Sequence, residues 1–195
     1  IAKNHPVDLG MVSDPKLTLA QLANVLLTVM TPQQKADASA RTTEIAKAKQ
    51  AKYESLLLSD SAVIDSVPLK FSRFAEELRD LLPVDAMIFD EALTSSPELT
   101  RYLIPTKPGH YFLTRGGSLG VGIPGAIGAK LAHPNKTVIG ITGDGGAMYT
   151  IQALWTAARY NVDAKFIICN NLSYKLLQLN VLAYWQERGI SKHDY

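Results

Sequence analysis

The sequence predicts an α/β fold in which a parallel sheet carries helices on both faces and is preceded by a helical segment. Downstream of about Val67, short apolar stretches of strand length alternate with helical patterns, and that alternation is typical of parallel sheets covered on both faces. Glycine-rich or polar turns follow the expected strands. Upstream, apolar residues recur at helical spacing and glycine is almost absent.

The first 66 residues are expected to be the helical tail of a neighbouring domain and a linker. Apolar residues recur at helical spacing over Leu17–Met30. A second helix is expected from Thr31 to about Leu58, because Thr31-Pro32-Gln33-Gln34 offers an N-cap threonine, a proline at the first helical position and a glutamine at N3. Ser59–Val67 is expected to be the linker. Since the chain starts at Ile1, we expect it to be a piece of a longer protein.

Residues 67–195 are expected to form the sheet domain, cut short at its carboxyl end. The expected strands, each a short apolar run, are Ala86–Asp90, Tyr111–Thr114, Thr137–Thr142 and Ala164–Cys169. The expected helices are Phe71–Leu82, an alanine-rich segment ending at Ala132, Gly146–Tyr160 and Tyr174–Arg188. Ligands of such sheets bind beyond the carboxyl ends of the strands, so we expect a binding site in the turns that follow the strands.

Charge and composition exclude several function classes. The 195 residues include 20 Lys and Arg against 18 Asp and Glu, a net charge of +2, which argues against binding to nucleic acid or to an anionic membrane. No run of about 18 apolar residues suggests a membrane span. Cys169 is the sole cysteine and cannot form an internal disulfide, which indicates a reducing compartment, and we expect the cytoplasm.

The densest chemical signal is Thr142–Ala147, between an expected strand and an expected helix. Glycines on both sides of Asp144 allow a tight turn and close approach to a ligand, and a helix start favours a phosphate. A carboxylate beside phosphates needs a cation between them, so Asp144 is interpreted as a Mg²⁺ or Ca²⁺ ligand. An ordinary Gly-Asp-Gly turn is the alternative.

Asn170-Asn171 ends the next expected strand and supplies the second half of the signal. Consecutive parallel strands open on the same edge of a sheet, so Asn171 is expected to face Asp144 although it lies 27 positions away. An amide oxygen suits a Mg²⁺ site. A plain Asn-Asn turn is the alternative.

Gly143-Asp144-Gly145, followed by 24 residues and Asn170-Asn171, resembles the thiamine diphosphate motif of the acetolactate synthase, pyruvate decarboxylase and benzoylformate decarboxylase superfamily. The resemblance covers about Val67–Tyr195. It implies a domain that binds thiamine diphosphate and Mg²⁺ in a 2-oxo acid decarboxylase or an acetolactate-synthase-like carboligase, with residues 1–66 from the end of its middle domain. The implied partners are a 2-oxo acid and, in a homodimer or tetramer, further copies, but neither nucleic acid nor membrane.

The resemblance also implies roles for individual residues. The metal ligands would be Asp144, Asn171 and the backbone carbonyl of Ser173. The cofactor would be bound by Thr94, Ser95, Gly117, Leu119, Gly143, Gly145, Gly146, Ala147, Tyr149 and Asn171, with Leu119 forcing its two rings into a V. Leu177 and Asn180 would border the substrate.

Two departures from the family pattern limit these roles. Gly146 stands where many relatives have serine, so a hydroxyl contact to the diphosphate is lost. The glutamate that activates the cofactor in the family lies in a separate domain outside this chain. The chain would therefore hold no catalytic residue, and we expect it to be inactive when isolated.

Gly120-Val-Gly-Ile-Pro-Gly125 supports an alternative function, that of an NAD(P)-binding Rossmann-type oxidoreductase. It matches the dinucleotide pattern, and Asp144 follows 19 residues after its third glycine. Pro124 argues against it, since proline removes a backbone donor. Close helix packing is the other explanation for glycines 120, 122, 125 and 128. A non-catalytic module is a further alternative.

Overall fold

A computed structural model describes residues 4–114 and 116–191 of the chain. The chain divides into two units, Ile1–Leu57 and Leu58–Tyr195. The sequence places the division at residue 66 instead, and the reason for the difference lies in the last turn of the second helix.

The first unit contains helix α1 (Pro15–Val29) and most of helix α2 (Pro32–Ser61). The expected capping box is present: the Gln34 backbone N–H donates to Thr31 Oγ1 at 3.2 Å, and the Thr31 N–H donates to Gln34 Oε1 at 2.9 Å. Both helices begin and end within three residues of the positions that the sequence predicts.

The end of α2 belongs to the second unit because of Asp60. Its carboxylate pairs with the guanidinium of Arg101 and accepts a hydrogen bond from the Tyr102 hydroxyl at 2.9 Å. Burial, and then the bond to Asp60, raise the pKa of Tyr102 to about 12. The predicted linker therefore starts with a helical turn that is fixed in place.

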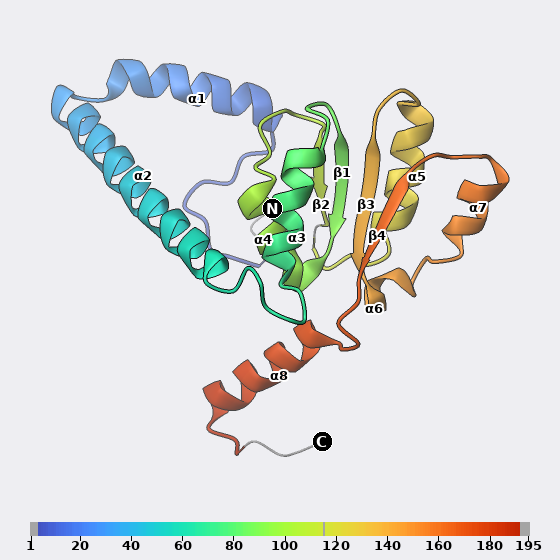
Figure 1. Ribbon diagram of the computed structural model, residues 1–195. Helices are drawn as coiled ribbons and strands as arrows, with labels where there is room; N and C mark the ends of the chain where they lie inside the picture. Colours follow the sequence, from blue (N-terminus) through green and yellow to red (C-terminus); the bar gives the residue numbers. More distant parts are fainter. Residues whose placement is uncertain (1–3, 115, 192–195) are drawn as a thin grey trace. The chain divides into compact units, whose positions relative to one another are not determined.

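The second unit is built on a four-stranded parallel sheet, as the sequence predicts (Figure 1). Its strands are β1 (Met87–Glu91), β2 (Tyr111–Leu113), β3 (Val138–Gly143) and β4 (Lys165–Cys169), in the order β2-β1-β3-β4. The two central strands are almost wholly buried, as expected of a parallel sheet.

Helix α5 (Gly122–Ala132) packs on β1 and β3. Its apolar face joins two buried clusters, one containing Ile123, Ile127, Ala147 and Ala157, the other Met87, Ala126 and Val138. Helix α3 (Phe71–Leu81) packs against helix α4 (Ser96–Tyr102).

Two segments differ from the prediction. A 3₁₀ turn, η1 (Leu93–Ser95), and α4 lie between β1 and β2, where no helix is expected from the sequence. The run Ser95-Ser96-Pro97-Glu98 at the start of α4 is a helix-start signal. The predicted helix Gly146–Tyr160 is split into α6 (Asp144–Ala147) and α7 (Ala153–Arg159). Between them the backbone makes i→i−3 bonds, and the Thr150 hydroxyl bonds to Gly120 O at 2.9 Å.

Close packing explains some of the clustered glycines. A Cβ at Gly125 would lie 2.6 Å from the Phe89 ring, and one at Gly122 would lie 3.0 Å from Glu91 Oε2. Gly120 has a φ of +93°, a conformation that favours glycine. The packing interpretation is wrong for Gly128, since nothing lies within 4 Å of a Cβ there.

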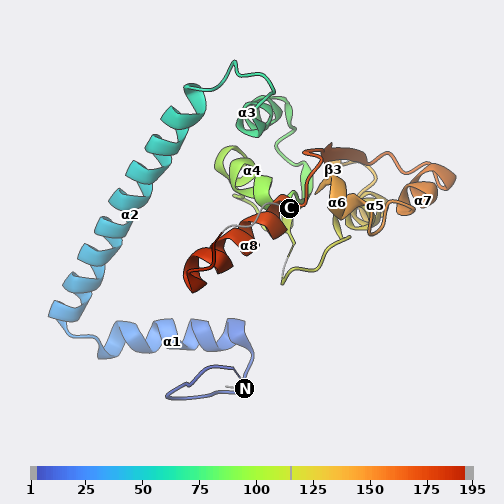
Figure 2. The same ribbon diagram turned by 90° about the horizontal axis from the view of Figure 1, so that it is seen from below.

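Helix α8 (Lys175–Arg188) follows β4 and ends at Gly189 in the left-handed conformation. Figure 2 shows α8 extending away from the sheet, and none of the residues of α8 is buried. Figure 1 places α6 and the start of α8 beyond the carboxyl ends of the strands. Of the helices in the described parts of the chain, none is both long and apolar enough to cross a membrane.

Candidate functional site

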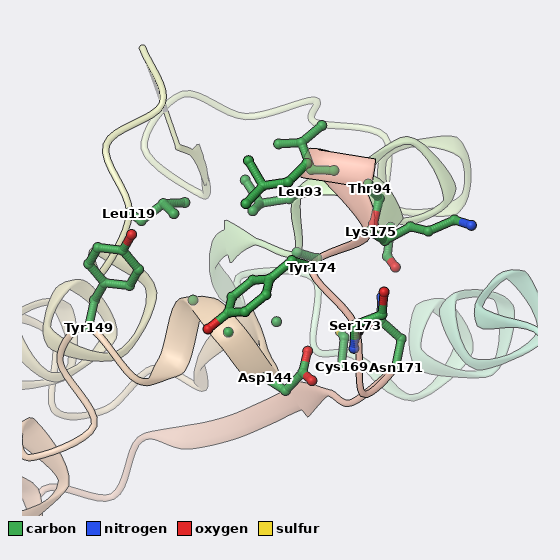
Figure 3. A pocket seen from close by; sticks show the side chains of 17 residues that line it. Leu93, Thr94, Leu119, Asp144, Tyr149, Cys169, Asn171, Ser173, Tyr174 and Lys175 are labelled. Atoms are coloured by element: carbon green, nitrogen blue, oxygen red, sulfur yellow. Dashed lines mark hydrogen bonds between the residues drawn. The ribbon is translucent and has the colours of Figure 1, made fainter. Parts of the chain in front are cut away.

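A cavity of about 170 Å³ lies at the carboxyl ends of β1, β3 and β4 (Figure 3). The segments that follow these three strands form its walls, together with Leu119 and the first turn of α8. Its lining residues are Ala92, Leu93, Thr94, Ser95, Leu119, Gly143, Asp144, Gly145, Gly146, Tyr149, Cys169, Asn171, Ser173, Tyr174, Lys175, Leu176 and Leu177.

Most residues that the sequence singled out meet at this cavity. They are Thr94, Ser95, Leu119, Gly143, Asp144, Gly145, Gly146, Tyr149, Asn171, Ser173 and Leu177. Three others are not among its lining: Gly117, Ala147 and Asn180. Ala147 is only 3% exposed and packs in the core with Ile123, whereas Asn180 lies farther along α8, on an exposed position.

The turn after β3 requires glycine at two positions. A Cβ at Gly146 would lie 2.7 Å from Thr142 Oγ1 and 3.2 Å from Glu91 Oε1. A Cβ at Gly145 would lie 2.8 Å from the ring of Tyr174. Both glycines line the cavity with backbone alone, which allows a ligand to approach their N–H groups closely.

Asp144 is a half-buried carboxylate with no partner among the residues that the structure describes. No hydrogen bond or ion pair reaches it from them, and of their carboxylates it alone lines the cavity. Nor do residues 4–114 and 116–191 contain a cluster of three or more His, Cys, Asp or Glu able to hold a metal. A cation at Asp144 would have to take its other ligands from amides, backbone carbonyls and a bound anion.

Asn170 and Asn171 shape the loop after β4 with their own side chains. Asn170 Oδ1 accepts from the Leu172 N–H at 3.1 Å, and Asn171 Oδ1 accepts from the Ser173 N–H at 2.9 Å. The alternative interpretation as a turn is thus correct for the loop. It does not exclude a ligand role, because an amide oxygen has a second lone pair. Figure 3 shows Asp144 and Asn171 rising from neighbouring strand ends, with Leu119 and Tyr149 across the cavity.

Asp90 fixes the wall that follows β1. Its carboxylate, 1% exposed, accepts hydrogen bonds from the Ala92 N–H at 2.9 Å, the Ser96 hydroxyl at 2.7 Å and the Tyr111 hydroxyl at 2.6 Å. Burial, and then the bond to Asp90, raise the pKa of Tyr111. The segment that carries Thr94 and Ser95 is thereby held rigidly.

Six lining residues were not predicted: Ala92, Leu93, Cys169, Tyr174, Lys175 and Leu176. All six lie within two positions of a predicted residue in the sequence, and that proximity is the signal that could have found them. Burial, followed by the charges of Asp90 and Asp144, raises the pKa of Cys169 to about 12, so its thiol is neutral at physiological pH. Figure 3 shows the amino group of Lys175 extending away from Asp144.

The geometry contradicts the alternative of a dinucleotide site at Gly120–Gly125. That site requires a helix directly after the first strand, with free N–H groups. Helix α5 follows β2 instead, and the N–H groups of Gly120 and Gly122 donate to the Glu91 carboxylate. A carboxylate thus already occupies the start of α5, where a pyrophosphate would have to bind.

Comparison with known proteins identifies the domain. Residues 94–194 match the family model of the thiamine pyrophosphate enzyme, C-terminal TPP binding domain. Benzoylformate decarboxylase of Pseudomonas aeruginosa is 41% identical over 111 residues, which is 57% of this chain and 21% of that protein. The "Probable acetolactate synthase large subunit" of Methanocaldococcus jannaschii is 29% identical over 200 residues, covering 99% of this chain and 32% of that protein.

Solved structures agree with the sequence relatives. The thiamine diphosphate-dependent 4-hydroxybenzoylformate decarboxylase of Rhodococcus jostii RHA1 has 32% identity and a TM-score of 0.58, over 66% of this chain and 24% of that one. The chain therefore spans between about a fifth and a third of the length of these relatives.

Proposed function

The chain belongs to the family of thiamine pyrophosphate enzymes, whose C-terminal cofactor-binding domain it contains, and we propose that it binds thiamine diphosphate together with Mg²⁺ in the cavity at Asp144. One observation carries this proposal. A half-buried carboxylate, to which no described residue bonds, lies in a turn flanked by glycines that line the cavity, and a cation between the carboxylate and a diphosphate would satisfy both.

The proposed metal ligands are Asp144, the Asn171 amide oxygen and the Ser173 backbone carbonyl. They are a carboxylate, an amide and a carbonyl, the hard oxygen donors that Mg²⁺ selects. All three residues line the cavity. With a single carboxylate, the protein alone offers an incomplete site, and diphosphate oxygens would complete it.

The proposed contacts to the cofactor come from both walls. Gly143, Gly145 and Gly146 would bind the diphosphate through their backbone, with Tyr149 as a hydroxyl donor and Asn171 beside them. Thr94 and Ser95 would reach it from the wall that Asp90 holds. Leu119 would support the V-shaped arrangement of the rings. Gly117 and Ala147 are also proposed to contact the cofactor, although neither residue lines the cavity.

We propose that the whole protein is a 2-oxo acid decarboxylase or an acetolactate-synthase-like carboligase, as the names of its relatives suggest. The cofactor, when bound, serves as an electron sink for cleavage of the bond next to a carbonyl carbon. The residues that line the cavity would fix its position. Leu177 would border the substrate, and Asn180 would do so only at the outer edge of the site.

Exposed apolar residues suggest that the protein works as a homodimer or tetramer. On α8, the exposed fractions are 60% for Leu177 and 52% for Tyr184, and on α7 the exposed fraction of Trp155 is 68%. Large apolar side chains left exposed in this way are typical of a face covered by another protein surface.

The single cysteine, free in this structure, supports a reducing compartment such as the cytoplasm.

The proposal is tested by calorimetric titration of the chain with thiamine diphosphate, with Mg²⁺ and with EDTA. We expect binding that requires Mg²⁺, and no binding of NAD under either condition. Metal-independent binding of thiamine diphosphate, or binding of NAD, would contradict the proposed site.

A further inference from the structure

Both backbone groups of Gly120, the residue directly after Leu119, are hydrogen-bonded to side chains. Its N–H donates to the Glu91 carboxylate, and its carbonyl accepts from the Thr150 hydroxyl at 2.9 Å. Gly120 itself is buried, with a φ of +93°. A Cβ there would lie 2.9 Å from Thr150 Cγ2, so the backbone packs directly on Thr150. These contacts fix where the chain leaves Leu119.

Glu91 connects this peptide to the glycine turn. Its side chain is 1% exposed and also accepts from the N–H of Gly122, the first residue of α5. A negative charge is stabilised at a helix N-terminus. The same carboxylate lies 3.2 Å from the place of a Cβ at Gly146, so it lies beside the turn that carries Asp144.

We propose that Glu91 and Thr150 are positioning residues that hold Leu119 at a fixed place relative to the Gly143–Gly146 turn. The inference rests on the proposed function, in which the rings of thiamine diphosphate lie on Leu119 and its diphosphate lies on the turn. Neither Glu91 nor Thr150 lines the cavity, so both act through Gly120. The part of the ligand that depends on them is the ring portion.

The role is tested by comparing two ligands, thiamine diphosphate and inorganic diphosphate, each titrated with Mg²⁺ into the full chain. Inorganic diphosphate reaches the turn and Asp144 but has no rings to place on Leu119. Thr150→Val removes the hydroxyl and keeps the shape of the side chain. Glu91→Gln replaces one oxygen that accepts a backbone N–H by an amide donor. Thr43→Val is the matched control, because its hydroxyl bonds only within α2, to Ser39 O.

We expect Thr150→Val and Glu91→Gln to weaken thiamine diphosphate about tenfold while leaving inorganic diphosphate within about twofold of wild type. Thr43→Val should change neither affinity. Equal losses for both ligands would show a merely structural role, and unchanged affinity for both would show no role; either result overturns the inference. If Glu91→Gln does not fold, Thr150→Val decides. If wild type binds neither ligand, the proposed function itself fails, a result distinct from these two.

Discussion

Replacing Asp144 by alanine should abolish Mg²⁺-dependent binding of thiamine diphosphate and leave the fold intact. No other carboxylate lines the cavity among the described residues, so the charge that balances the cation would be lost entirely. We expect the dissociation constant to rise more than about a hundredfold, at 1.4 kcal/mol for each tenfold. Because no described residue bonds to this carboxylate, the melting temperature should stay close to that of wild type.

Two further variants separate the contributions of the charge and of the individual oxygen ligands to metal-dependent binding. Asp144→Asn keeps an oxygen ligand but loses the charge, so its affinity should fall between wild type and Asp144→Ala. Asn171→Ala removes one neutral oxygen that water replaces, and should weaken binding by about tenfold. Asp163→Ala is the control, since Asp163 is exposed and pairs only with Lys165 at 3.5 Å. Calorimetric titration at fixed Mg²⁺ measures all four variants. Wild-type affinity in Asp144→Ala would contradict the metal site.

Gly140→Ala should cause a large loss of stability. Gly140 lies in β3 beneath α5, and a Cβ there would lie 2.7 Å from the Gly122 carbonyl oxygen and 3.0 Å from the Ala126 Cβ. The first of these atoms is backbone, so only a shift of α5 relieves the clash. Overpacking of this kind costs about 3 kcal/mol, and for a chain of this size the melting temperature should fall by roughly 5–10 °C.

Gly128→Ala is the matched control on α5 itself. Nothing lies within 4 Å of a Cβ at that position, and alanine favours a helix over glycine by up to about 1 kcal/mol. This variant should be as stable as wild type or more stable. Thermal unfolding followed by circular dichroism measures both proteins. Equal stability of Gly140→Ala and wild type would show that α5 does not pack on β3 as described.

The sequence predicts the sheet well because each strand is a short apolar run bounded by turn residues. β1, β3 and β4 begin within one residue of their predicted starts, since each is a short apolar run followed by a turn. The capping box at the start of α2 is equally predictable from the sequence, because its two residues, Thr31 and Gln34, lie three positions apart. The division of Gly146–Tyr160 into two helices is not predictable in this way, because it accompanies the hydrogen bond from Thr150 to Gly120, 30 residues away.

For the site, the sequence reveals the residues at strand ends but not what supports them. The parallel topology alone brings Asp144 and Asn171 to one edge of the sheet. By contrast, the contacts of Asp90 and Glu91 reach Tyr111 and Gly122 across 21 and 31 residues, and no local pattern indicates such pairs. Ala147 shows the opposite case: its motif position predicts a cofactor contact, and no local pattern indicates that its side chain packs in the core with Ile123 and Ile127 of α5.

The central claim, a metal-bridged diphosphate at Asp144, is tested most directly by locating the ion. Crystals of the chain grown with thiamine diphosphate and Mn²⁺ in place of Mg²⁺ permit this, because manganese gives an anomalous signal. We expect one anomalous peak within coordination distance of the Asp144 carboxylate and the Asn171 amide oxygen, with diphosphate density beside Gly145 and Gly146. A diphosphate bound elsewhere, or bound at this turn with no ion at Asp144, would contradict the claim.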